Sequence, residues 1–345
     1  MRIYWIDTAK ALGIIFVLFG HTKGIDPSIK KYLYSFHLPL FFFLSGYLLK
    51  EKYLSGSFKN YFTKNLRNIV IPYLAFWALS YPYWVLNGLV KKQLNINDIS
   101  IFFKPLFGLI YGTDARLISN DVLWYFTCLF CTTIIFYWVA RLNYPLRIAL
   151  LFLLGILGPA LPDLIGFRLP WNLEVSFVAV VFFGTGHFCS DLEFKQINHN
   201  PLSQSITASL LAVTFLVSVT QNTAVNLSGM KFGNLGYFYL GAFSGISLTI
   251  LLSRMIPHNH ILDWISRNTI IIFPLHIVIF SIFTGIGVLF LNLDPEFNKT
   301  STLSCFVYTF GAIITCIPIS YLIRNYTPWI IGLQREKTAL LKPVS

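Results

Sequence analysis

Three ionisable side chains lie within the first apolar stretch of the sequence, where charge is costly and commonly serves a function. The stretch reads YWIDTAKALGIIFVLFGHT and contains Asp7, Lys10 and His21. At 100° per residue, Lys10 and His21 project within about 20° of each other on a helix, and Asp7 and His21 within about 40°. Lys10 and His21 are separated by roughly 16 Å along the axis, about half the thickness of the hydrocarbon core. The pattern predicts a helix with a cation near one membrane surface and an imidazole towards the other.

Each of these residues also has a structural explanation. Lys10 can extend its amino group to the inner interface with Asp7 as its counter-ion, and His21 can simply occupy a helix end at the outer interface. In the functional explanation, His21 acts as a general base. The shared helical face favours the functional explanation.

A second histidine occurs in the next apolar stretch, which reads YLYSFHLPLFFFLSGYLL. His37 lies about four residues from the outer end of this stretch, so we expect it at the depth of His21 on a neighbouring helix. Two imidazoles at one depth suit a pair in which both act as bases or one orients the other. Ser45 and Gly46 permit close helix packing further along.

A basic segment precedes the third apolar stretch. Lys64 and Arg67 are three residues apart and are therefore neighbours on one face of a helix. Such a pair can bind a phosphate group. The alternative is that these cations only reflect the enrichment of Lys and Arg in cytoplasmic segments of membrane proteins.

An acidic residue starts a later apolar stretch in the segment PWNLEVSF. Glu174 lies about two residues into the expected helix, on the outer side, where the helix dipole favours a negative charge. Its carboxylate can orient a histidine or bind a ligand, or it can serve the helix start alone.

The elements that must position these residues are transmembrane helices. Hydrophobic residues make up 55% of the 345 residues and charged residues 12%, which is about half the charged share of a soluble domain. About ten apolar stretches approach the length of about 20 residues that a spanning helix needs. They are residues 5–23, 33–50, 69–90, 121–140, 146–163, 172–189, 204–220, 235–254, 268–291 and 302–323. We therefore predict an all-α, polytopic bundle of about ten transmembrane helices.

A single transmembrane domain then covers residues 1–326, followed by a tail at 327–345. The tail places Trp329 and aliphatic residues among cations, as in an interfacial helix. The longest connection, 91–120, contains an apolar patch at 101–111 that fits a segment lying on or dipping into the membrane. Lys and Arg are more frequent on the side of the N-terminus, which predicts that both termini are cytoplasmic.

The composition also bears on other classes of protein. A formal charge of +12 would suggest nucleic acid in a soluble protein, but the cations here are spread over loops between apolar runs, so we expect no nucleic-acid partner. The five cysteines lack metal-ligand spacing, and we predict neither a metal site nor a permanently bound cofactor. An ion-coupled transporter or flippase is the alternative to an enzyme, although no internal repeat of the kind common in transporters is evident.

The order of these residues resembles the acyltransferase-3 family of membrane acyltransferases, in particular the branch grouped with fucose 4-O-acetylases. That family has an acidic residue, a basic residue three positions later and a histidine after ten further residues, as Asp7, Lys10 and His21 stand here. The FHMPLFFFLSGY segment of the branch is similar to FHLPLFFFLSGY at residues 36–47.

Later motifs extend the resemblance over most of the chain. The family's basic pair before the third helix is matched by Lys64 and Arg67. A segment like LWFL appears as LWYF and contains Trp124, and an element like YxLH appears as FPLH and contains His276. Lys10 and Lys64 stand where Arg is commoner, which keeps the charge but loses the planar guanidinium fork.

The resemblance implies transfer of an acyl group, usually acetyl, from cytoplasmic acyl-CoA to a hydroxyl of a cell-surface or lipid-linked glycan, at a bacterial inner membrane. Acetyl-CoA is then a co-substrate rather than a resident cofactor. The hypothesis assigns catalysis to His21, His37 and Asp7, phosphate binding to Lys10, Lys64 and Arg67, and acceptor contacts to Glu174, Trp124 and His276. Direct transfer and an acyl-histidine intermediate both stay open, as do the acceptor and the length of the acyl group.

Overall fold

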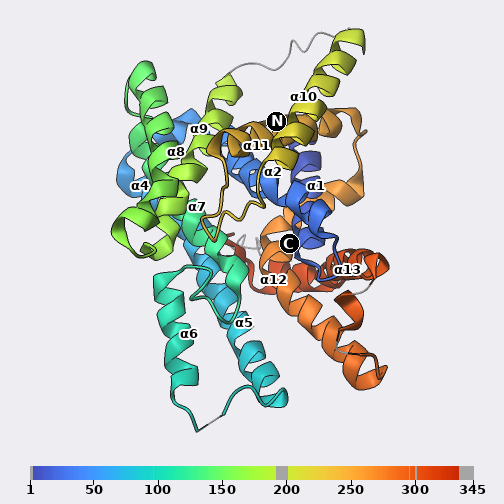
Figure 1. The fold of residues 1–345 in the computed structure, drawn as a ribbon. Coiled ribbons are helices and arrows are strands. Elements are labelled where there is room, and N and C mark those ends of the chain that lie inside the picture. Colours follow the sequence, from blue (N-terminus) through green and yellow to red (C-terminus); the bar gives the residue numbers. More distant parts are fainter. Residues whose placement is uncertain (1–2, 96, 192–200, 295, 300, 334–345) are drawn as a thin grey trace, which may run out of the picture.

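The computed structural model describes residues 3–95, 97–191, 201–294, 296–299 and 301–333, and these residues form helices joined by loops (Figure 1). The only β pairing among them is an isolated bridge between Asn226 and Lys231. The all-α prediction is confirmed. In chain order the helices are α1 (Tyr4–His21), α2 (Pro27–Tyr47), α3 (Glu51–Leu54), α4 (Phe58–Asn65), α5 (Ile71–Val90), α6 (Ser100–Tyr111), α7 (Trp124–Val139), α8 (Tyr144–Ile165), α9 (Leu173–Asp191), α10 (Pro201–Gln221), α11 (Leu235–Met255), α12 (His260–Phe290) and α13 (Thr302–Tyr326).

Within the described residues, eight helical segments are long and apolar enough to cross a membrane. One runs from Phe58 to Val90 through α4 and α5, and the others contain α7 to α13. α1 and α2 have 18 and 21 residues, but charged residues such as Asp7 and Lys10 lower their hydropathy. When α1 and α2 are included, every apolar stretch expected from the sequence corresponds to a helix.

Prolines do not interrupt the helix expected at residues 146–163. α8 continues through Pro159 and Pro162 and ends at Gly166. The glycine has φ +77°, a left-handed conformation that is typical of the residue that ends a helix. Two separate long helices, α8 and α9, therefore fill this part of the chain, as predicted.

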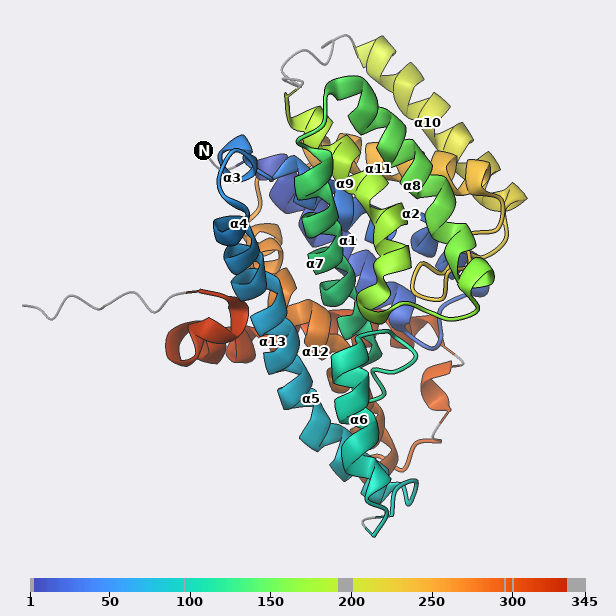
Figure 2. The same ribbon diagram turned by 90° about the vertical axis from the view of Figure 1, so that its left-hand side faces the viewer.

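The helices that carry the ionisable residues lie inside the bundle. α1 packs against α2, α11 and α12, and α2 packs against α9 and α11 (Figure 2). The apolar windows of α7 and α9 are 67% and 61% buried, whereas those of α8 and α10 are 17% and 11% buried. Because lipid can cover exposed apolar side chains, α8 and α10 form an outer layer around the more buried helices.

α2 and α9 cross with their backbones in direct contact. A Cβ atom on Gly46 would lie 1.9 Å from the carbonyl oxygen of Phe183, and one on Gly186 would lie 2.0 Å from that of Phe43. No side chain fits at either position, so this crossing requires two glycines. The close packing predicted at Gly46 is confirmed.

Two apolar segments lie outside the long helices. α6 has 12 residues, too few to span a bilayer; it exposes Phe103 and Ile110 and projects beside α5 at one end of the molecule (Figure 1). A short 3₁₀ helix at Pro328–Ile331 starts the tail and buries Ile331 in the core. The rest of the expected interfacial helix, residues 334–345, lies outside the described residues.

Candidate active site

One face of α1 lines a series of cavities that pass through the bundle. The N-terminal cavity has a volume of about 740 Å³ and is lined by Asp7 and Lys10. Lys10 and Ile14 line the central cavity, of about 250 Å³. The histidine cavity, of about 310 Å³, is lined by His21 and His37. The helix face inferred from residue spacing is therefore the face that lines this series.

Adjacent cavities share lining residues. Lys10 borders both the N-terminal and the central cavity, and Leu38 and Phe273 border both the central and the histidine cavity. Apolar and aromatic side chains, including Phe41 and Tyr125, make up most of the central wall. Side chains, not helix backbones, therefore separate neighbouring cavities. The central cavity is the smallest of the three along α1 and has a mostly apolar lining.

The predicted basic pair lines a fourth cavity, the basic cavity, of about 710 Å³. Lys64 and Arg67 both border it, together with Lys59 and Asn68. Asn68 also lines the central cavity, so a second route reaches the middle of the series. The amino group of Lys64 lies over the ring of Tyr53, 3.1 Å from the ring centroid, which holds the charge beside an aromatic face.

A π-helical turn between α4 and α5 positions Arg67. The turn spans Leu66–Val70, and the N–H of Ile71 donates to the carbonyl of Leu66, five residues back. Pro72 follows and has no N–H to offer the carbonyl of Asn68, so the ordinary helical bond is missing at this point. Such a turn is often found at functional sites, and here it sits where the basic and central cavities meet.

Three imidazoles share one hydrogen-bonding pattern. The Nδ1 atoms of His21, His37 and His276 lie 2.8, 2.6 and 2.5 Å from a backbone carbonyl oxygen of their own helix. A carbonyl oxygen can only accept, so each Nδ1–H donates and each Nε2 keeps a lone pair. The Nε2 atoms of His37 and His276 are buried with no hydrogen-bond partner among the described residues. The rings are therefore arranged to offer a basic nitrogen.

The ring in direct contact with His21 belongs to α12. The ring centroids of His21 and His276 are 5.0 Å apart with an interplanar angle of 73°. Tyr34 contacts both members of the expected pair, because its ring centroid lies 5.8 Å from that of His21 and 4.9 Å from that of His37. His21, Tyr34 and His37 thus line one cavity, and sequence reasoning missed Tyr34. His276 contacts His21 but lines none of the four cavities.

Polar and charged side chains from helix starts and connections complete the histidine cavity. Trp124, predicted from its motif, lines it together with Lys30, Asp114, Asp121 and Asn226. Oδ1 of Asp114 is buried and has no hydrogen-bond partner among the described residues. The two carboxylates and the amide lie in connections between the long helices, Asp121 in a short 3₁₀ helix, where no hydrophobic periodicity in the sequence marked them.

Two predicted site residues lie elsewhere. Asp7 borders the N-terminal cavity and accepts a hydrogen bond of 2.6 Å from Ser266, about 21 Å along α1 from His21. Glu174 is completely buried, pairs with Arg168 and lines none of the four cavities. The ion pair instead fixes the connection that leads into α9.

His187 also borders the N-terminal cavity, and the sequence analysis did not assign it a role. Its side chain is buried, and Nε2 lies 3.5 Å from Oε2 of Glu51, another lining residue. The histidine lies on α9, and no spacing or periodicity in the sequence set it apart.

The comparison with protein families gives one match. The family model for the acyltransferase domain of the acyltransferase-3 type covers residues 3–324, which include all nine predicted site residues. No curated protein and no solved structure matches the chain. The match covers nearly the whole chain, and eight described helical segments suit a bilayer. The chain therefore belongs to the acyltransferase-3 family and is a multi-pass membrane acyltransferase.

Proposed function

We propose that the protein transfers an acyl group, acetyl in the simplest case, from cytoplasmic acyl-CoA to a hydroxyl group of a glycan or lipid-linked sugar at the outer side of a bacterial inner membrane. The observation that supports this proposal is the series of neighbouring cavities that share lining residues, from the basic cavity at Lys64 and Arg67 and the N-terminal cavity at Lys10 to the cavity lined by His21 and His37. Both termini are cytoplasmic in this arrangement.

The donor enters from the cationic end. Phosphate groups of acyl-CoA bind cations strongly, and Lys64 with Arg67 offer two of them in one cavity. Lys10, at the boundary of the N-terminal and central cavities, offers a third. The pantetheine arm is thin and largely uncharged, so it suits the narrow central cavity. Its thioester then reaches the histidine cavity, on the far side of Leu38 and Phe273.

The reaction uses Nε2 of His21. In direct transfer, Nε2 takes the proton of the acceptor hydroxyl while the oxygen attacks the thioester carbon, and the C–S bond breaks to release the CoA thiolate. In stepwise transfer, Nε2 attacks the thioester carbon and the C–S bond breaks, which releases the CoA thiolate and leaves an acyl-imidazolium. The acceptor oxygen then attacks the acyl carbon, the C–N bond breaks, and the hydroxyl proton ends on the freed Nε2. Both routes need the lone pair that the Nδ1 hydrogen bond leaves on Nε2.

The acceptor binds in the histidine cavity. Asp114, Asp121 and Asn226 offer the carboxylate and amide groups that hydrogen-bond to sugar hydroxyls. Trp124 offers an aromatic ring of the kind that packs against the apolar face of a sugar. This lining favours a polyhydroxylated acceptor over an apolar one. A sugar acceptor also agrees with the resemblance to fucose 4-O-acetylases.

Inside-out membrane vesicles provide the test. Vesicles that contain the protein and carry lipid-linked glycans in the leaflet that faces the lumen receive acetyl-CoA, labelled in the acetyl group, from outside. We expect label in the glycan with the wild-type protein, and almost none with His21→Ala at matched expression. Consumption of acetyl-CoA only by right-side-out vesicles would contradict the cytoplasmic donor. Label in a protein or phospholipid fraction alone would contradict the glycan acceptor.

A further inference from the structure

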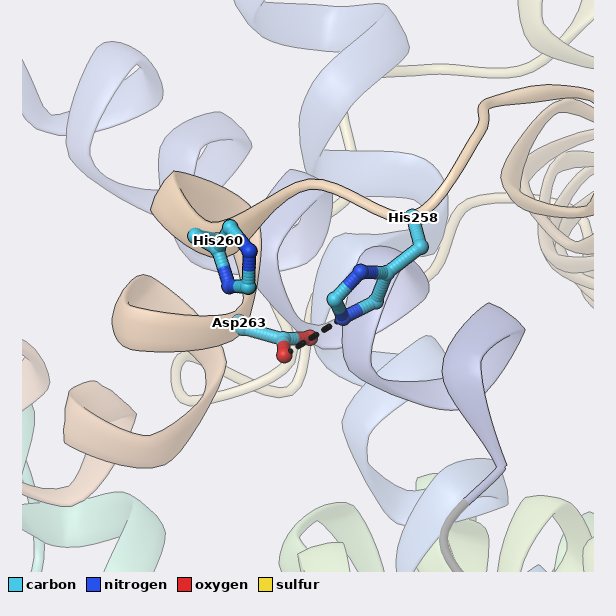
Figure 3. Close-up of side chains that lie close together, drawn as sticks. All are labelled: His258, His260 and Asp263. Atoms are coloured by element: carbon cyan, nitrogen blue, oxygen red, sulfur yellow. Dashed lines mark hydrogen bonds and ion pairs between the residues drawn. The ribbon is translucent and has the colours of Figure 1, made fainter.

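A group of metal-ligating side chains lies at the N-terminal end of α12, outside the four cavities. His258, His260 and Asp263 each offer a ligand atom, and these atoms lie within 4.8 Å of one another. Figure 3 shows the two imidazole rings beside the Asp263 carboxylate. No other set of three histidine, cysteine or acidic side chains in the described residues meets this criterion. The proposed acyl transfer does not use any of the three.

The local fold explains why these side chains converge. His260 and Asp263 are three residues apart in the first turn of α12, so they share one face. His258 precedes the helix and turns back, which brings its Nε2 to 2.8 Å from Oδ2 of Asp263. The side chain of Asn259 caps the helix by accepting the N–H of Ile261 at 2.8 Å. Capping therefore does not account for the convergence of the other three side chains.

A second contact holds the group in place. The ring of Tyr4, at the start of α1, packs edge-on against His258 with the ring centroids 4.5 Å apart. The imidazoles of His258 and His260 are themselves 5.1 Å apart. His258 and His260 are exposed, whereas Asp263 is buried, so the carboxylate is a fixed ligand and the rings can adjust around it.

We propose that His258, His260 and Asp263 bind Zn²⁺ or a similar divalent transition-metal ion. Imidazole nitrogen and carboxylate oxygen are ordinary Zn²⁺ ligands, at about 2.0–2.2 Å from the metal. Tetrahedral ligands at those distances are roughly 3.3 Å apart, so the pair now joined by a hydrogen bond needs to open by only about 0.5 Å. Three protein ligands leave a fourth position for water. Mg²⁺ and Ca²⁺ prefer oxygen ligands and fit poorly.

The bound ion would fix His258 against the first turn of α12, and the ring of Tyr4 at the start of α1 packs on His258. The same two helices meet one turn later, where Ser266 donates to Asp7 at 2.6 Å. α12 also carries His276, and α1 carries His21. The metal would therefore strengthen the contact between α1 and α12, the helices that carry His21 and His276. It would take no part in acyl transfer.

Zn²⁺ titration of the purified full-length protein, with any affinity tag removed, tests this proposal. We expect one Zn²⁺ per chain, and a visible absorption band when Co²⁺ replaces it. His260→Ala should weaken binding by at least about 100-fold, the upper range for loss of a supporting residue at a metal site. Because His260 is exposed, this variant should show an unchanged melting temperature in EDTA.

His21→Ala is the matched control, since it removes an imidazole from the other group of histidines. It should bind Zn²⁺ as the wild type does. Equal Zn²⁺ affinity of wild type and His260→Ala, or no binding by the wild type, would overturn the proposal. Loss of binding in His21→Ala alone would assign the ion to the histidine cavity and would equally overturn it. Acyl transfer is not part of the readout, so failure here leaves the proposed reaction untouched.

Discussion

The two ends of α1 face cavities of different chemical character. Around Lys10, the N-terminal cavity is lined by charged side chains that include Asp7, Lys50 and Glu51. Around His21, the rings of Tyr34 and His276 are close neighbours, two of the nearby imidazole nitrogens are buried without partners among the described residues, and charged side chains line another part of the same cavity. One helix thus carries a cation at one end and an imidazole beside further imidazoles at the other.

The difference indicates how a membrane enzyme can divide binding from chemistry. A charged donor is held most easily where cations are near water, since buried charges are costly. Proton abstraction or acyl capture instead needs a nitrogen that is not engaged by another group. If this division is real, variants at the Lys10 end should change the apparent affinity for the donor, and variants at the His21 end should change turnover.

The largest effect is expected for His21→Ala. Removal of the general base or nucleophile should lower turnover by about 10²–10⁴-fold, with little change in the KM for acyl-CoA. The measurement is acetyl transfer by purified protein at matched concentration. Phe19→Ala is the control, because Phe19 is a ring on the same helix that contacts Phe306 and lines none of the four cavities. A His21→Ala rate above about a tenth of wild type would mean that His21 is structural.

Arg67→Ala and Lys10→Ala should show the opposite pattern. Loss of a hydrogen bond to a charged group costs about 1.5–3 kcal/mol, so the KM for acyl-CoA should rise roughly 10- to 100-fold while kcat changes little. Steady-state kinetics at varied acetyl-CoA concentration separate the two parameters. Lys10→Arg keeps the charge and should restore much of the affinity. A fall in kcat at unchanged KM would contradict the proposed separation of donor binding from catalysis.

His37→Ala and His276→Ala test which of these two imidazoles assists His21. Each should lower turnover by less than about 10²-fold, because neither is assigned the proton transfer itself. The ring contact with His21 predicts the larger loss for His276→Ala. The two rates, with the pH dependence of kcat, show which imidazole orients His21. A loss for either variant as large as that of His21→Ala would move the reacting nitrogen to that residue.

The smallest effect on catalysis is expected for Glu174→Gln. The side chain is completely buried and paired with Arg168, so breaking the pair should destabilise the fold, by up to about 3–5 kcal/mol for a fully buried pair. The melting temperature should fall, and the KM for the acceptor should stay as it is. A raised acceptor KM with unchanged melting would restore the role in acceptor binding that the sequence suggested for Glu174.

Helix positions and the lining face of α1 were predictable because both depend on periodicity along one chain segment. The spacing of Lys10 and His21 defines a face whatever surrounds it, and hydropathy defines the long helices. Gly46 was also predictable, since small residues mark close helix contacts. The donor, the acceptor and the orientation in the membrane stay predictions.

The remaining parts of the site depend on packing between distant segments. The contact of His276 with His21 requires α12 to lie against α1, and no local pattern specifies that neighbour. Asp114 comes from a loop, where periodicity gives no information. Glu174 shows the same limit in another way: its charge was visible in the sequence, but its partner Arg168 was not.

The crossing of α2 and α9 at Gly46 and Gly186 has a consequence for motion. With backbone against backbone, neither helix can slide or roll without a clash, so we expect the two to move as one stiff wall with very slow amide hydrogen exchange. Asn226, Leu227 and Ser228, in the connection between α10 and α11, border the histidine cavity, and the one β bridge in this connection joins Asn226 and Lys231. Exchange in this connection should be faster than at the α2–α9 crossing. A bulky sugar would then enter the histidine cavity past a more compliant connection and meet α2 at His37 and Leu38.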